Sequence, residues 1–163
     1  MTAPLKLKGS VKRVHDALVA AGYQAEIVRF GDSARTSEEA AAAVGCELAQ
    51  IGKSLVFRTE NGDRPVLVIA SGANRVDPDR VADALGEAIA RADAGYVRTK
   101  TGFAIGGVAP LGHKEQPLTV IDADLLGFSE IWAAAGAPDA VFRLDPAHLE
   151  TMTGGTVADV KLD

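Results

Sequence analysis

Cysteine is almost absent from this sequence, because its 163 residues contain a single one, Cys46. One cysteine cannot form an internal disulfide, which fits the reducing conditions of the cytoplasm. Long apolar runs are also absent, so no membrane span is expected. The N-terminal MTAPLKLKGS lacks the apolar segment of a signal peptide. We therefore expect a cytoplasmic protein that has no membrane partner.

Several ligand-binding signatures are missing as well. The chain has no G-x-x-x-x-G-K-[ST], no G-x-G-x-x-G and no cysteines or histidines paired at zinc spacing. Its three histidines, His15, His113 and His148, lie far apart in sequence, so a metal site would require all of them to converge. Ser71 is not part of a G-x-S-x-G elbow, which argues against a serine hydrolase. The sequence thus predicts neither a cofactor nor a metal.

Composition indicates one globular domain over residues 1–163, with 47% hydrophobic and 24% charged residues. The net charge of −5 argues against a generic nucleic-acid coat. The charge is uneven, since residues 116–163 hold eight acidic and two basic side chains. An anionic partner should therefore meet the first two-thirds of the chain. An ordinary solvated surface explains the same distribution.

Apolar periodicity and turn residues predict a mixture of short helices and strands. We expect helices that begin at Ser10, Thr36, Asp77-Pro78 and Asp145-Pro146, each ending at a glycine. We expect strands at residues 24–30, 54–59, 65–71, 140–144 and 156–162, and a strand followed by a turn within residues 119–126. Asn61-Gly62 predicts a hairpin, and the unbroken apolar run 65–71 a central strand buried on both faces. The fold class is therefore α/β with a mixed sheet rather than a doubly wound parallel one.

The stretch TGFAIGGVAPLG, residues 101–112, combines four glycines with a proline. Gly106 and Gly107 permit positive φ and close approach of a ligand, and Pro110 fixes φ. A strand that breaks into such a stretch can present backbone N–H groups to a carbonyl, carboxylate or phosphate oxygen. A β-bulge or tight bend without chemistry produces the same pattern. The local pattern slightly favours the structural bend.

Two reactive side chains stand near predicted strands. Lys53 lies where the strand 54–59 begins, and such a lysine is usually an edge or snorkelling residue. At the mouth of a pocket it would be a fixed cation for a phosphate or carbonyl. A nucleophilic cysteine needs a base or a positive environment, and none is near Cys46 in sequence. We expect Cys46 to have a packing role.

Five segments, taken in order, resemble the YbaK/ProX family: QIGKSLVF, SGANRVD, TGFAIGGVAPLGH, TVIDADLL and AGAPDAVFRLDPAHLETMTGG. This family comprises free-standing aminoacyl-tRNA deacylases related to the editing insertion domain of bacterial prolyl-tRNA synthetase. The resemblance runs from about Arg35 to the C-terminus. It implies one compact YbaK-like domain, with a curved mixed sheet flanked by short helices. Its pocket would receive the aminoacylated 3′ end of a mischarged tRNA and hydrolyse the ester.

The resemblance also implies roles for particular residues. Lys53 matches the essential lysine of the family, and Gly106 to Pro110 its G-x-x-x-P loop. We expect the N–H groups of Gly106 and Gly107 to stabilise the ester oxyanion, a contribution of about 3 kcal/mol per donor. With no general base assigned, the ribose hydroxyl or the amino group of the substrate would activate the water. From their places beside the motifs, we expect substrate contacts at Ser54, Ser71, Asn74, Thr101, Pro110 and His113.

Two departures bear on the amino acid that is removed. Ala134 stands where some cysteine-directed members carry serine, and His148 where such members are acidic. We therefore expect a small aliphatic amino acid, alanine or 2-aminobutyrate, on tRNA(Pro), with some breadth because one methylene is worth about 1–3 kcal/mol. A non-catalytic module acting with a synthetase, prolyl-tRNA synthetase being the candidate, is the alternative. A metal-dependent or nucleophile-dependent hydrolase that uses His113 or Cys46 is a third interpretation.

Overall fold

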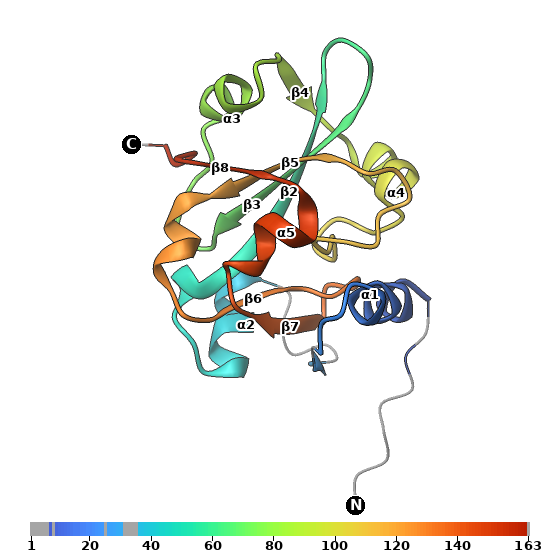
Figure 1. The fold of residues 1–163 in the computed structure, drawn as a ribbon, viewed down its shortest axis with the longest axis vertical. Coiled ribbons are helices and arrows are strands. Elements are labelled where there is room, and N and C mark those ends of the chain that lie inside the picture. The colour runs from blue at the N-terminus through green and yellow to red at the C-terminus, as the bar shows by residue number, and fades with distance from the viewer. Residues whose placement is uncertain (1–6, 8, 25, 31–35, 163) are drawn as a thin grey trace, which may run out of the picture.

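The computed structural model describes residues 7, 9–24, 26–30 and 36–162 (Figure 1). Its centre is one eight-stranded mixed sheet of order β1-β7-β6-β2-β3-β5-β8, with β4 paired to β2. The strands are β1 (Ile27–Arg29), β2 (Ile51–Thr59), β3 (Pro65–Ser71), β4 (Ile89–Arg91), β5 (Leu118–Asp122), β6 (Ile131–Ala134), β7 (Ala140–Leu144) and β8 (Thr156–Ala158). The helices are α1 (Gly9–Ala20), α2 (Ser37–Val44), α3 (Pro78–Leu85), α4 (Ala94–Thr101) and α5 (His148–Thr153), with 3₁₀ turns η2 (Leu48–Gln50) and η3 (Ala123–Gly127).

The β2–β3 hairpin lies at the centre of the sheet. Its antiparallel register runs from Gly52 opposite Ser71 to Arg58 opposite Pro65, and Gly62 takes φ +88° in the turn. Every residue of β3 is buried, as predicted for a central strand. β5 pairs with β3 in parallel, and β8 pairs with β5 in parallel. Parallel and antiparallel pairs therefore coexist, which confirms the predicted mixed α/β class.

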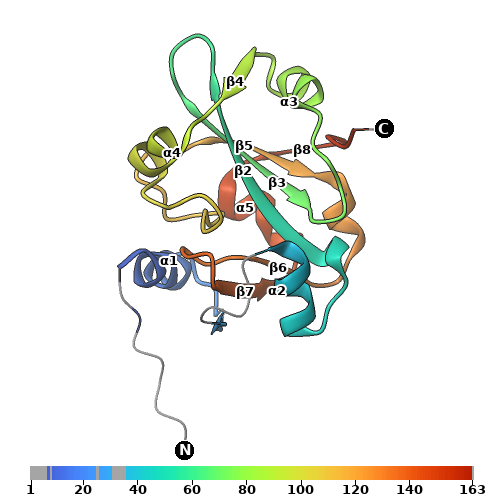
Figure 2. The same ribbon diagram turned by 180° about the vertical axis from the view of Figure 1, so that it is seen from behind.

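Alternate residues of β3 supply two separate cores. Leu67 and Ile69 belong to the larger cluster, together with buried residues of α1, α4 and α5. Val66 and Val68 face the other side, where they pack with Val81 of α3. Figures 1 and 2 show α5 on one face of the sheet and α3 beside β4. The strand is apolar throughout because both of its faces are covered.

One edge of β2 is paired only at its two ends. β6 meets it in parallel at two residue pairs, Ile51 with Trp132 and Gly52 with Ala133. β4 meets the same strand at residues 57–59. Among the described strands, none pairs with this edge at residues 53–56. The sheet therefore has an opening beside Lys53, and β6 and β7 lie apart from its larger part (Figure 2).

Local capping signals predicted α2 and α3 well. The Thr36 Oγ1 atom accepts a hydrogen bond from the Glu39 N–H at 3.1 Å, and Gly45 ends α2 in the left-handed region. Asp77 caps α3, and Gly86 ends it. The strands expected at 65–71 and 140–144 have those bounds. These boundaries are set by neighbouring residues, so short-range patterns suffice to place them.

Other expectations were wrong. Ser10 does not cap α1, which begins at Gly9, because its Oγ donates a 2.6 Å hydrogen bond to the distant Gly136 carbonyl. The first strand is shorter than 24–30, and residue 25 lies outside the described residues. The stretch 101–112 does not follow a strand either, since helix α4 leads into it.

No helix in the described ranges is long and apolar enough to cross a membrane.

Candidate active site

Lys53 is the third residue of β2 and lies beside the unpaired part of its edge. The side chain is half-buried, and its Nζ donates a 2.5 Å hydrogen bond to the Asn74 carbonyl. Burial lowers the pKa of Lys53, while the negative charges of Asp122 and Glu38 raise it and Arg75 lowers it further. The site therefore holds an ammonium group that is partly removed from water.

A small pocket of about 130 Å³ opens beside Lys53. Three alanines, Ala133, Ala134 and Ala140, form part of its wall, and the N-terminal end of α2 forms another part. We call this site the alanine-lined pocket. Since a water molecule takes up about 30 Å³ of liquid volume, only a small group fits. The two small strands β6 and β7 thus place methyl groups opposite the lysine.

A larger groove of about 600 Å³ shares Lys53 with the alanine-lined pocket. Its cations are Lys53, Arg75 and Arg91, and its apolar lining includes Phe57 and Ile89. Both arginines are exposed, and neither has an ion-pair partner in the part of the chain that the structure describes. We call this site the cationic groove. It combines unpaired positive charge with an apolar floor that can carry a base.

Ser54 also lines the alanine-lined pocket. Its Oγ atom is buried and has no hydrogen-bond partner within the described residues. Buried hydroxyl groups are nearly always hydrogen-bonded in folded proteins. An unpaired hydroxyl at a pocket wall is therefore a candidate contact for a polar atom of a ligand.

Gly106 lies in the same pocket as Lys53, and its φ of +89° favours glycine. Its N–H makes no backbone hydrogen bond inside the described ranges. Gly107 differs, because it is buried and its N–H donates to the Ala104 carbonyl at 3.0 Å. A Cβ on Gly107 would lie 2.7 Å from the Ala137 Cα. The expectation that both N–H groups face the pocket is thus corrected: Gly107 is a packing glycine.

Helix α1 holds the segment that carries Gly106. The Arg13 Nε atom donates to the Gly112 carbonyl at 2.8 Å, and its Nη2 donates to the Thr101 carbonyl at 3.3 Å. The guanidinium also stacks over the Phe103 ring, 4.5 Å from its centroid. Since residues 102–117 contain no helix or strand, side chains of a distant helix supply bonds that a sheet would otherwise provide.

Thr101, Pro110 and His113 were expected to contact substrate, and the structure places them inside the scaffold. The Thr101 hydroxyl donates to the Val97 carbonyl at 2.6 Å. Pro110 is buried and lines neither the alanine-lined pocket nor the cationic groove. The His113 Nε2 atom lies 2.6 Å from the Ala109 carbonyl oxygen, and burial lowers the pKa of this histidine. These three residues stabilise the loop rather than line the site.

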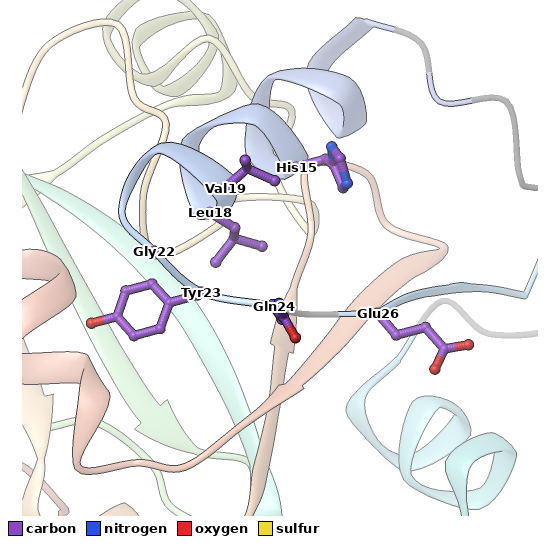
Figure 3. Close-up of a pocket in the computed structure, with 7 residues that line it drawn as sticks. All are labelled: His15, Leu18, Val19, Gly22, Tyr23, Gln24 and Glu26. Carbon is purple, nitrogen blue, oxygen red and sulfur yellow. The ribbon is translucent and has the colours of Figure 1, made fainter.

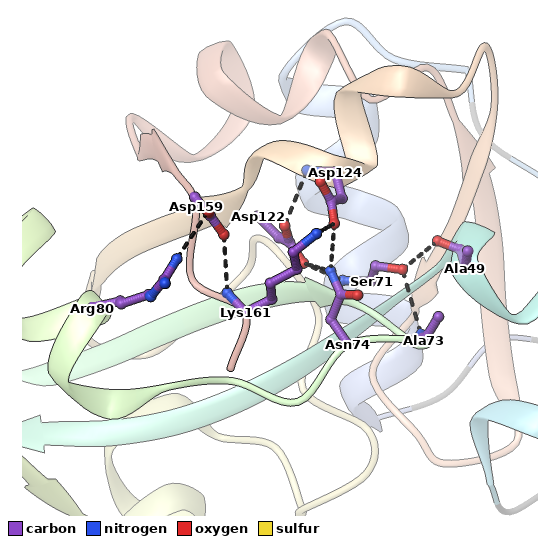
Figure 4. A network of polar contacts seen from close by, with 9 residues as sticks. All are labelled: Ala49, Ser71, Ala73, Asn74, Arg80, Asp122, Asp124, Asp159 and Lys161. Atoms are coloured by element: carbon purple, nitrogen blue, oxygen red, sulfur yellow. Dashed lines mark hydrogen bonds and ion pairs between the residues drawn. The ribbon is translucent and has the colours of Figure 1, made fainter. Parts of the chain in front are cut away.

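Ser71 and Asn74 also have structural partners (Figure 4). The buried Ser71 hydroxyl donates to the Ala49 carbonyl at 2.7 Å. The Asn74 side-chain amide donates to Asp122 and Asp124 at 2.9 and 2.8 Å. Neither residue lines the alanine-lined pocket or the cationic groove. Asn74 reaches the site only through its backbone carbonyl, which holds Lys53.

Cys46 has the packing role predicted for it. It is half-buried and packs, as Phe30 and Trp132 do, against a buried cluster of Ala40, Ala41 and Ile51. Burial raises the pKa of its thiol, and the nearby carboxylates of Glu130 and Glu47 raise it further. The thiol is therefore kept protonated at neutral pH, which is unfavourable for nucleophilic catalysis. No group of three or more metal-ligating side chains occurs among the residues described.

Another hollow, of about 600 Å³, lies at the end of α1 (Figure 3). His15, Tyr23 and Glu26 line it, and in the close-up their polar ends point in different directions. His148 lies near it, with its ring centroid 5.2 Å from that of Tyr23. The hollow contains none of the predicted site residues. Its diverging polar groups make it a weaker candidate than the two pockets at Lys53.

The comparisons with known proteins agree with one family. The model of the aminoacyl-tRNA editing domain matches residues 32–152. "Uncharacterized protein YwhH" of Bacillus subtilis is 31% identical over 140 residues, which are 86% of this chain and 88% of that protein. "Putative Cys-tRNA(Pro)/Cys-tRNA(Cys) deacylase EbsC" of Enterococcus faecalis is 27% identical over 126 residues, covering 77% and 76% of the two chains.

A solved crystal structure described as that of "a putative trans-editing enzyme for prolyl tRNA synthetase" has the same fold. It superposes with a TM-score of 0.91 at 44% sequence identity, over 97% of this chain and 100% of that one. The match to the domain model begins after α1, so the helix that holds the Gly106 segment lies outside it.

Proposed function

The chain belongs to the aminoacyl-tRNA editing domain family and is an aminoacyl-tRNA deacylase, a hydrolase, and we propose that it acts in trans on tRNA(Pro) mischarged with alanine or 2-aminobutyrate. The family is the one that the ordered motifs predicted. We further propose that the enzyme works in the cytoplasm, where tRNA is charged, and that prolyl-tRNA synthetase is a partner.

The observation that carries this proposal is the place of Lys53 between two sites of different chemistry. In our proposal the amino-acid side chain enters the alanine-lined pocket. The 3′-terminal nucleotide lies in the cationic groove, with its phosphate near Arg75 and Arg91 and its base against Phe57. The ester that joins the two parts of the substrate then lies at the Lys53 ammonium.

Hydrolysis of the ester requires stabilisation of one developing negative charge. Water adds to the carbonyl carbon, and the oxygen that becomes anionic meets the Lys53 ammonium and the Gly106 N–H. Removing one such donor typically lowers kcat by about 10²–10³. The neighbouring ribose hydroxyl relays a proton from the water to the leaving ribose oxygen, or the amino group of the substrate takes that proton and returns it to the same oxygen. When the tetrahedral intermediate collapses, the bond between the carbonyl carbon and the ribose oxygen breaks, and free tRNA and amino acid are released.

The size of the alanine-lined pocket supports the proposed substrate. About 130 Å³ is enough for a methyl or ethyl side chain, and each extra methylene changes the free energy of binding by about 1–3 kcal/mol. Ala134 lines this pocket with a methyl group, so position 134 offers no hydroxyl to bond a thiol, and the hydroxyl-bearing residues of the pocket are Thr36, Ser37 and Ser54. The tRNA(Pro) part of the proposal is supported by the prolyl-tRNA synthetase association of the structural relative.

Deacylation of tRNA(Pro) charged in turn with alanine, 2-aminobutyrate, cysteine, serine and proline tests the proposal. We expect alanine and 2-aminobutyrate to be removed fastest and proline to be retained. Lys53→Ala should lower kcat/KM about 100-fold or more. Lys12→Ala, which removes an exposed lysine paired with Asp16, is the control.

Three results would contradict the proposal. Unchanged activity of Lys53→Ala removes the catalytic role of the lysine. Fastest hydrolysis of the cysteine ester removes the proposed amino-acid class. Loss of activity on thiol alkylation or in His113→Ala, with the fold retained, would support the hydrolase that uses Cys46 or His113.

A further inference from the structure

Asp122, at the end of β5, is the only charged side chain among the buried residues of the described chain, at 1% exposure. Its Oδ2 accepts hydrogen bonds from the Ser71 N–H at 3.0 Å and from the Asn74 amide at 2.9 Å. Its Oδ1 accepts one from the Asp124 N–H at 3.0 Å. A buried carboxylate is tolerated when several donors satisfy it, and these contacts meet that condition (Figure 4).

Two of these bonds hold opposite ends of the same four-residue turn. Ser71 begins it, Asn74 ends it, and the Asn74 N–H closes it by donating to the Ser71 carbonyl at 3.0 Å. The carbonyl of Asn74 then accepts the hydrogen bond from Lys53 Nζ. A continuous chain of contacts therefore joins the buried carboxylate at the end of β5 to the ammonium group of Lys53 at the proposed substrate site.

We propose that Asp122 is a positioning residue for deacylation: by fixing the turn 71–74, it aims the Asn74 carbonyl at Lys53 Nζ and holds the ammonium between the alanine-lined pocket and the cationic groove. This inference rests on the proposed role of Lys53. A lysine side chain is flexible and carries three N–H donors. With one donor anchored on Asn74, the other two are left for the substrate.

A purely structural role for Asp122 makes a different prediction. Its bond to the Asp124 N–H caps η3, so its loss could destabilise the fold without changing Lys53. Electrostatics separate the two roles. The Asp122 charge is one of the groups that raise the pKa of Lys53, together with Glu38 and against Arg75. Removing the charge should therefore lower the pKa of Lys53 as well as loosen the turn 71–74.

The test compares Asp122→Asn, Asn74→Ala and Asp124→Asn in the full chain, with alanyl-tRNA(Pro) as substrate. Asp124 is the matched control, because it bonds the same Asn74 amide from the exposed side. We expect Asp122→Asn to lower kcat about 10- to 100-fold, since small misplacements of a catalytic group have effects of that order. Asn74→Ala should lower kcat less, and KM should change little in both.

A second measurement reports on the lysine itself. The protein is acylated with an amine-selective ester at fixed pH. Mass spectrometry then gives the acylation rate of Lys53 relative to that of Lys12. We expect Lys53 to react several-fold faster in Asp122→Asn, because a freed amine with a lower pKa has a larger unprotonated, nucleophilic fraction at the same pH. Asp124→Asn should leave this rate unchanged.

The outcomes separate the two proposals. If Lys53→Ala is inactive while folded Asp122→Asn keeps the wild-type kcat and labelling rate, the positioning role is wrong and the proposed function stands. If Lys53→Ala is fully active, the catalytic role of Lys53 is wrong, and the positioning role of Asp122 is wrong with it. If the wild-type protein does not hydrolyse alanyl-tRNA(Pro), the proposed function is wrong. Should Asp122→Asn not fold, Asn74→Ala decides, and wild-type values for it would overturn the inference.

Discussion

Two walls of the alanine-lined pocket are built in different ways. One wall is the strand β2, which presents Lys53 and Ser54 and is held to β3 by an unbroken antiparallel register. The other includes Gly106, carried by a segment without helix or strand. That segment is held by Arg13 and by the close packing of Gly107 on Ala137.

This difference determines what substitutions should do. Backbone pairing in the strand wall does not depend on side chains, so its side chains are free to serve chemistry. In the loop wall, individual side chains and glycines determine the path of the backbone. We therefore expect changes in the strand wall to alter activity alone, and changes in the loop wall to alter stability and activity together.

Gly107→Ala should have the largest effect. The added Cβ would lie within 2.9 Å of three Ala137 backbone atoms, and overpacking of this kind typically costs about 1–3 kcal/mol. We expect that loss in the free energy of unfolding, measured by urea denaturation, and about a 100-fold loss in kcat/KM. Gly127→Ala is the control, because a Cβ there meets no atom within 4 Å. Equal stability of the two variants would contradict the role of this contact.

Arg13→Ala should have the next largest effect. It removes two hydrogen bonds to loop carbonyls and the stacking on Phe103, together about 2 kcal/mol of stability. Arg58→Ala is the matched control: it lies on β2 outside the pocket wall, where Arg58 stacks on Tyr96 and pairs with Asp63. Both variants should unfold at a lower urea concentration, but only Arg13→Ala should lower kcat/KM, by about tenfold. A similar loss of activity in both would remove the distinction between the walls.

Ser54→Ala tests the strand wall. Its buried hydroxyl has no partner within the described residues, so its removal should leave the free energy of unfolding unchanged or slightly higher. Deacylation should still slow by about fivefold, the effect of losing roughly 1 kcal/mol of substrate bonding. Ser129→Ala, at an exposed position, is the control. A loss of stability together with the loss of activity would show that this wall behaves like the loop, and unchanged activity would contradict the substrate contact.

The smallest effect concerns acid stability of the loop wall. Burial holds the pKa of His113 below its ordinary value, which is about 6.5. As the pH falls below that value, the unfolded chain binds a proton that the folded chain does not, so stability declines until the lowered pKa is reached. His113→Phe should reduce this decline between pH 7.5 and pH 5.5, as measured by urea denaturation. An identical decline in both proteins would contradict it.

Sequence patterns predicted the parts of the fold that neighbouring residues determine. The Asn61-Gly62 turn and the apolar run 65–71 placed the β2–β3 hairpin, and the capping residues placed α2 and α3. Lys53 and Gly106 were found through ordered motifs and do line one pocket. Their shared location depends on the hairpin and on a loop that follows α4.

The remaining features depend on distant contacts. Gly106 and Gly107 are adjacent and identical in type, and only packing against Ala137 separates their roles. Thr101 and His113 flank the loop in sequence, yet contacts within the loop turn them inward. Arg75 and Arg91 were missed because a groove forms only when β4 lies beside β2. No local pattern marks an exposed arginine as part of a groove.

The join between β6 and β2 also has a mechanical consequence. Only two residue pairs connect these strands, so β1, β7 and β6 are attached to the rest of the sheet by a narrow hinge. Lys53 and Ser54 lie on one side of this hinge, and Ala133 and Ala140 lie on the other. Short junctions of this kind open locally more readily than a central hairpin. In the proposed binding mode, we therefore expect opening at this junction, as well as the methyl groups, to set the largest amino acid that enters the pocket.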